Sequence, residues 1–92
     1  MKQESIEYTV QIWKEGESFI AHAMPLDVMS SGGTPDEARK ALHEAVELFL
    51  STSAQMGTLK EVLLECGYER TNRHWTSPDW VAVERQAAVV GD

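Results

Sequence analysis

One segment in the middle of the chain predicts a long amphipathic helix with a well-defined start. Thr34 is suited to the N-cap, Pro35 follows at the first helical position, and Glu37 lies three residues after the cap. Apolar residues then recur at steps of three and four and form one stripe: Ala38, Ala41, Leu42, Ala45, Val46, Leu48 and Phe49. Such a helix is stable when it buries its stripe against another element. We expect it to end near Gln55, because the preceding serines and threonine are weak helix formers.

The residues before this helix predict a small antiparallel sheet. Apolar and polar residues alternate over 6–13, and residues 18–24 read as a second strand. The polar turn at 14–17 is short, so the two strands should form a hairpin. Pro25 ends the second strand, and residues 27–30 predict a brief third one. We expect the helix to pack across the hairpin through its alanine-rich face.

The C-terminal third predicts a short helix and a last strand. Residues 58–61 repeat the capping pattern, and Gly67 is suited to stop the helix that follows. Its inward positions should be Leu59, Val62, Leu63 and Cys66. Residues 69–78 are mostly polar and show no sustained helix or strand periodicity, which indicates a loop or an irregular hairpin arm. The segment Trp80 to Val90 predicts the final strand.

These elements define the expected fold class. It is α+β, a small antiparallel sheet in the order β-β-β-α-α-β with one long helix packed across it. The length allows one domain over residues 1–92, in which residues 58–90 supply the short helix and the C-terminal strand.

Composition excludes several classes of function. Fifteen acidic residues against eight basic ones give a net charge of −7, which disfavours binding to phosphate backbones. The N-terminus is polar, and no apolar run approaches the ~20 residues that span a bilayer. The single cysteine, Cys66, cannot form an internal disulfide, and no Cys/His spacing indicates a metal site. We therefore expect a cytoplasmic protein without a cofactor or a membrane contact.

The histidines and carboxylates that could carry catalysis are too far apart in the sequence to indicate a catalytic site. His22, His43 and His74 lack a partner at the spacing of a catalytic triad, and we interpret them as ordinary, partly exposed histidines. A metal nuclease needs several carboxylates that converge from neighbouring strands, and only Glu7 and Glu84 have predicted strand-interior positions. The sequence thus predicts no catalytic residues, no metal ligands and no enzyme activity.

Three tryptophans in so short a chain point instead to contacts with proteins. Trp is enriched at interfaces, although for Trp75 and Trp80 we favour the interpretation that they cover the open end of the sheet. Trp13, Ile20 and His22 are the candidate partner-binding residues, the last two on the strand face opposite the helix.

A second candidate surface lies at the C-terminus. The segment that starts at Trp80 has few charges to protect a sheet edge. We expect the chain to form a homodimer or a higher homo-oligomer through Trp80, Val81 and Val83.

The order and spacing of several short segments resemble the HicB-type antitoxin domain over about residues 6–52. These segments are Tyr8-Thr9-Val10, Glu15 to Ala21, Pro25 in a strand break, Ser31-Gly32-Gly33-Thr34, Asp36-Glu37-Ala38 and Ala45 to Leu50. The resemblance implies a partial RNase H-like fold without nuclease chemistry. It also implies a role in a toxin–antitoxin system, in which the domain binds and neutralises a small HicA-type mRNA-cleaving toxin, encoded nearby, by protein–protein contact.

Two features differ from the family pattern. The segment 23–29 replaces a Cys-Pro-x-Leu-Pro-Gly-like stretch, and no helical periodicity of a DNA-binding module follows Gly67. We therefore do not expect direct DNA binding. Two alternatives stay open: a solitary HicB-like regulatory or binding domain without a toxin, and a residual RNase H-like metal nuclease.

Overall fold

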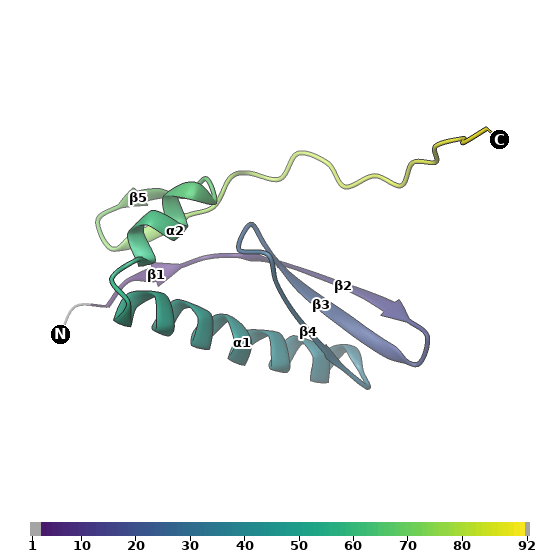
Figure 1. Ribbon diagram of the computed structural model, residues 1–92, viewed down its shortest axis with the longest axis horizontal. Coiled ribbons are helices and arrows are strands. Elements are labelled where there is room, and N and C mark those ends of the chain that lie inside the picture. The colour runs from purple at the N-terminus through teal and green to yellow at the C-terminus, as the bar shows by residue number, and fades with distance from the viewer. Residues whose placement is uncertain (1–2, 92) are drawn as a thin grey trace.

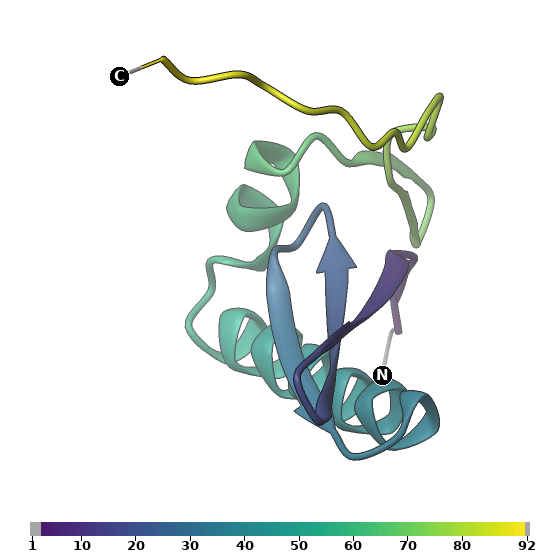
Figure 2. The same cartoon turned by 90° about the vertical axis from the view of Figure 1, so that its right-hand side faces the viewer.

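The computed structural model describes residues 3–91, which contain two helices and six strands. In chain order they are β1 (Ser5–Ile6), β2 (Thr9–Glu15), β3 (Ser18–Met24), β4 (Val28–Gly32), α1 (Pro35–Gln55), α2 (Leu59–Glu65), β5 (Glu69–Thr71) and β6 (His74–Thr76). Strands β2, β3 and β4 form an antiparallel sheet with α1 along one side of it (Figures 1 and 2). The predicted α+β class, with a long helix across a small antiparallel sheet, is confirmed.

The predicted hairpin is confirmed, with Gly16 at its turn. Gly16 has φ +58°, a conformation that glycine adopts without steric cost. The predicted strand over 6–13, however, divides between Ile6 and Thr9. The reason is that β1 pairs in parallel with β6, whereas β2 pairs with β3. One stretch of chain thus contributes to two sheets.

The start of α1 forms as predicted. The Glu37 N–H donates to the Thr34 Oγ1 at 3.0 Å, and the Glu37 carboxylate accepts from the Gly33 N–H at 3.0 Å. Ala38, Leu42 and Val46 are buried against the sheet, where Ala21 and Ala23 are fully buried opposite them. Leu48 does not belong to the buried stripe and is 70% exposed, because a three-stranded sheet covers only a narrow strip of the helix.

Helix α2 is present, but its predicted capping box is wrong. The Thr58 hydroxyl donates to the Ser53 carbonyl oxygen at 3.3 Å and makes no cap bond to α2. The backbone N–H of Thr58 bonds to the same carbonyl, so this residue closes the end of α1 instead. Gly67, with φ +91°, ends α2 as expected, and Leu63 enters the core.

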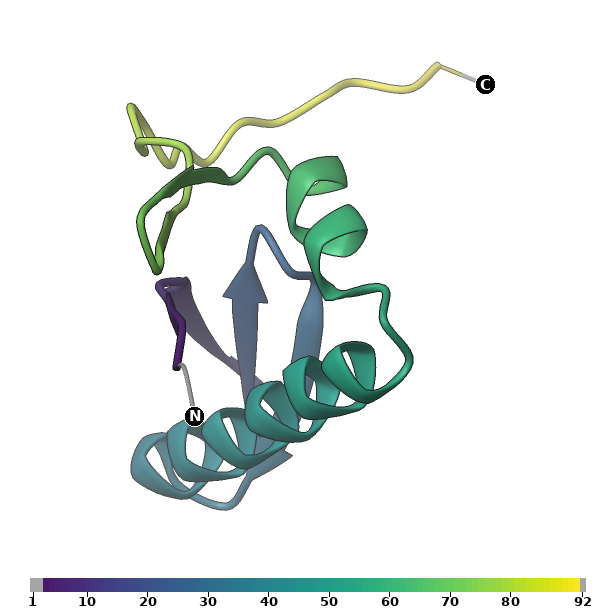
Figure 3. The ribbon, with the colours of Figure 1, turned by 90° about the vertical axis from the view of Figure 1, so that its left-hand side faces the viewer.

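The C-terminal segment differs most from the prediction. Residues 69–76 form the β5–β6 hairpin and bury Trp75, which is 1% exposed, so this tryptophan belongs to the core. The predicted strand from Trp80 to Val90 is wrong, because the chain there pairs with no other strand of the described part. We call residues 77–91 the C-terminal arm. The arm runs clear of the body (Figure 1), whereas α2 and the hairpin lie at the end of the sheet away from the β2–β3 turn (Figure 3).

Within residues 3–91, neither helix combines the length and the apolar character needed to cross a bilayer.

Gly32 provides a test of the contact between α1 and β4. A Cβ at Gly32 would lie 2.6 Å from the Ala38 backbone nitrogen, whereas one at Gly33 would meet only the Glu37 Oε1, at 3.1 Å. We expect Gly32→Ala to lower the free energy of unfolding by about 1–3 kcal/mol, because the helix start has to shift. Gly33→Ala should lower the free energy of unfolding clearly less, since the Glu37 side chain can move aside. Urea denaturation measures both, and equal losses would contradict this account.

Tyr68 makes the stability depend on alkaline pH. Its side chain is buried and its hydroxyl donates to the Glu7 carbonyl oxygen. Burial, aided by Cys66, Glu7 and Tyr8, raises the pKa of Tyr68 from 10.0 to about 12. A folded-state pKa above the unfolded value contributes stability below pH 10, which is lost as the pH rises towards 12.

We therefore expect urea unfolding to show falling stability between pH 10 and 12. The Tyr68→Phe variant should be less stable than the unmodified chain at neutral pH. Its free energy of unfolding should fall less between pH 10 and 12, because it lacks the hydroxyl that ionises. An unchanged alkaline loss in Tyr68→Phe would exclude Tyr68 as the cause.

Candidate functional site

The face of the β2–β3–β4 sheet opposite α1 carries large side chains. Cross-strand pairing places Trp13 beside Ile20 and His22 beside Met29. Successive residues of a strand point to opposite faces, and Ala21 and Ala23 point to α1, so Ile20 and His22 point away from it. We call Trp13, Ile20, His22 and Met29 the open face. The structure thus brings together all three residues predicted to bind a partner.

Trp13 is an exposed but fixed aromatic group. It is 37% exposed, and its Nε1–H donates to the Glu15 Oε1 at 2.9 Å. The edge of its ring meets His22, with ring centroids 6.1 Å apart at an interplanar angle of 70°. Met29 adds an apolar side chain that is 58% exposed. A side chain held in place before binding loses little entropy on binding, which suits Trp13 to be an anchor.

His22 is held by oxygens on both sides of its ring. Its Nε2 lies 2.6 Å from the Asp27 Oδ1, and its Nδ1 lies 3.5 Å from the Gln11 Oε1. The His22 side chain is 13% exposed and that of Asp27 is 82% exposed. Asp27 therefore presents a carboxylate at the margin of the open face, available to a cationic partner group.

Sequence reasoning missed the role of Asp27. Its φ of 61° lies in the left-handed region, which Asp tolerates better than most residues. The only local signal is its place directly after the Pro25-Leu26 break.

His43 belongs to a different surface, between β2 and α1. Its Nδ1 lies 3.0 Å from the Tyr8 hydroxyl, and its Nε2 lies 3.5 Å from the Glu47 Oε1. Burial and, to a smaller extent, the Glu47 charge raise the pKa of Tyr8. A nucleophilic tyrosine would need a lowered pKa, so this chain of contacts favours structure over nucleophilic catalysis.

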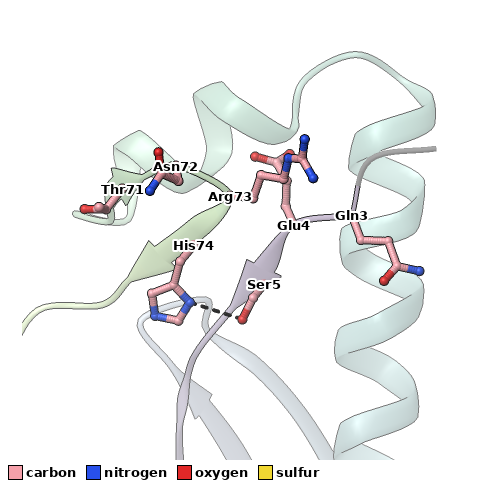
Figure 4. Close-up of a pocket in the computed structure, with 7 residues that line it drawn as sticks. All are labelled: Gln3, Glu4, Ser5, Thr71, Asn72, Arg73 and His74. Atoms are coloured by element: carbon pink, nitrogen blue, oxygen red, sulfur yellow. Dashed lines mark hydrogen bonds between the residues drawn. The ribbon is translucent and has the colours of Figure 1, made fainter.

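His74 borders an open hollow of about 600 Å³ that polar residues line between the N-terminal segment and the β5–β6 turn (Figure 4). Figure 4 shows the bond from its Nδ1 to the Ser5 hydroxyl, 3.2 Å long, and its Nε2 lies 3.3 Å from the Glu7 Oε2. Glu4, on the same hollow, accepts from the Trp75 Nε1–H at 2.9 Å and pairs with Arg70 at 3.0 Å. These polar groups satisfy one another, which indicates a structural role.

Cys66 lies partly buried against the core, as predicted for a small apolar side chain. Burial, then the charges of Glu65 and Asp27, raise the pKa of its thiol. A reactive cysteine needs a lowered pKa, so this geometry does not favour thiol chemistry.

The three residues predicted for self-association lie on the C-terminal arm. Trp80 is 43%, Val81 97% and Val83 75% exposed, and none of them is in a strand. Trp80 and Val81 border an apolar hollow of about 460 Å³ together with Met24 and Pro25. None of the four open-face residues borders this hollow, although Met24 follows His22 by two positions on β3.

Comparison of the chain with protein-family models, with curated proteins and with solved structures found no match in any of the three.

The arrangement of the carboxylates leads to a prediction about nuclease chemistry. The Glu7 Oε1 accepts from the backbone N–H and the hydroxyl of Ser77, whereas Glu84 lies on the exposed arm. Among the residues that the structure describes, no three His, Cys, Asp or Glu side chains form a group that could hold a metal ion. We expect purified protein to leave RNA intact in the presence of Mg²⁺ or Mn²⁺. Cleavage that is lost in Glu7→Gln would overturn this prediction.

Proposed function

We propose that this chain is a protein-binding module of the HicB antitoxin type, which neutralises a small HicA-type mRNA-cleaving toxin by covering its surface. The observation that carries the proposal is the open face, where Trp13, Ile20 and Met29 surround the His22–Asp27 pair. Interfaces of this kind depend on a few aromatic or apolar anchors surrounded by polar groups.

The fold supports the same proposal. A helix covers one face of the three-stranded antiparallel sheet and leaves the other face without a helix, so a partner can approach it. The segment that resembles the HicB-type domain, about residues 6–52, contains β2, β3, β4 and most of α1. We include the partial RNase H-like relationship in the proposal, as a binding scaffold without nuclease chemistry.

The charge fits a basic partner. An RNA-cleaving protein has to attract phosphates, and this chain carries a net charge of −7. Complementary charge mainly accelerates the encounter of two proteins. Asp27 and Glu15, which lie beside His22 and Trp13, would place negative charge next to the anchors themselves.

The proposal requires a gene for a small basic protein beside the gene for this chain, and it is tested by the binding kinetics of the full chain with that protein. We expect Trp13→Ala and Ile20→Ala each to raise the dissociation rate about tenfold, because the loss of one anchor costs more than about 1 kcal/mol. Added salt should slow association and leave dissociation nearly unchanged, since screening acts over about 8 Å near physiological ionic strength.

Leu48→Ala is the matched control, because Leu48 is an exposed apolar residue on α1, away from the open face. It should bind like the unmodified chain, and circular dichroism should show that all three variants fold. Normal binding by both anchor variants would reject this choice of face. If the neighbouring protein does not bind at all, the proposal of a toxin partner is wrong.

A further inference from the structure

The C-terminal arm resembles a strand that has no partner. Val81 is 97% exposed and Val89 98% exposed, and Val83 and Val90 are almost as open. Valine favours β-strands, and the chain here is extended without belonging to a sheet. Several apolar side chains exposed along one segment are typical of an interaction surface.

The root of the arm directs it away from its own sheet. The Ser77 N–H and hydroxyl donate to the Glu7 Oε1 at 3.1 and 3.3 Å. Pro78 then packs on Gly67, where an added Cβ would meet the Pro78 Cγ at 3.3 Å. Residues 78–82 still border the hollow at Met24 and Pro25, and beyond them the arm leaves the body (Figures 1 and 2). A strand partner for its outer part therefore has to come from another chain.

The outer edge of β2 is a site where a strand can add. β2 spans seven residues and pairs with β3 along one side, and no strand of residues 3–91 pairs with its other side. Directly before it, β1 already pairs with β6 through Ser5–His74 and Ile6–Trp75. Unpaired edges of this length readily accept a further strand.

A groove lies beside this edge. It has a volume of about 470 Å³ and is lined by Tyr8, Val10, Asp36, Arg39, Lys40 and His43. Val10 is 37% exposed there and offers an apolar contact. Three of the eight Lys and Arg residues, Lys14, Arg39 and Lys40, lie on β2 or the first turns of α1. The segment 81–90 carries Glu84 and Arg85, whose charges cancel, so what it offers to this groove is the apolar surface of Val81 and Val83.

We propose that two copies of this chain exchange their arms, so that residues 81–90 of each copy add as a strand to the outer edge of β2 in the other. Val81 and Val83, which point to the same face of a strand, cover the apolar part of the groove. Every copy has both an unpaired strand and an unpaired edge, so a second copy satisfies both at once in a two-fold symmetric dimer. Trp13 of the open face also lies on β2, but the pairing uses the backbone edge of that strand and the groove towards α1, and the inference does not depend on the proposed function.

The first test compares two matched exposed residues. Val83 is 75% exposed on the arm and Leu48 is 70% exposed on α1. We expect the full chain to sediment as a dimer, with Val83→Asp raising the dissociation constant of the dimer at least about tenfold, because the substitution replaces a buried apolar side chain by a charge. Leu48→Asp should leave it unchanged. A monomer at high micromolar concentration, or equal effects of the two variants, would overturn the proposal.

The second test locates the edge by cross-linking in a Cys66→Ala background. A chain with Val83→Cys is mixed with a chain carrying either Lys14→Cys on β2 or Ser31→Cys on β4. Because each chain has one cysteine, any mixed disulfide joins two copies. We expect rapid mixed disulfide formation with Lys14→Cys and little with Ser31→Cys. Preferential bonding to Ser31→Cys, or between two Val83→Cys arms, would contradict the β2 edge as the docking site.

Discussion

The close contact between α1 and its sheet determines the position of most other elements. Small side chains form this contact: Ala21, Ala23 and Ala38 are fully buried, and Gly32 leaves no room for a Cβ next to the helix start. Small residues let the helix and the sheet approach closely, and the larger side chains of Leu42 and Val46 are buried between them. A larger residue at any of these points would move the helix as a unit.

Because α1 contacts only one face of β3, different residues of this strand stabilise the fold and form the proposed binding surface. Along β3, alanines point to the helix and larger residues, Ile20 and His22, point to the open face. A substitution on the open face removes no core contact of α1, so binding residues there can change at small cost to folding. The proposed binding role and the fold thus rest on alternate residues of the same seven-residue strand.

The predictions that succeeded depend on neighbours in the sequence, and those that failed depend on distant contacts. The hairpin, the Thr34 cap and the side chains grouped on the open face follow from alternation and turn chemistry over a few residues. The burial of Trp75 could not be predicted, because its indole bonds to Glu4, 71 positions away. The segment from Trp80 has the composition of a strand. It remains unpaired because Pro78, packed on Gly67, sets its direction.

The pairing of β1 with β6 has a consequence for the order in which the chain folds during synthesis. Residues 9–55 contain the β2–β3–β4 sheet and α1, so this unit has all its strands once the chain is available up to Gln55. Ser5 and Ile6 have to wait until His74 and Trp75 have been added, because their partners lie 69 residues further along the chain. Ser5 and Ile6 are therefore among the last residues of the fold to reach their place, although they precede the sheet and α1 in the chain. Chains released before β6 would keep the open face but lack the buried indole that holds the N-terminus.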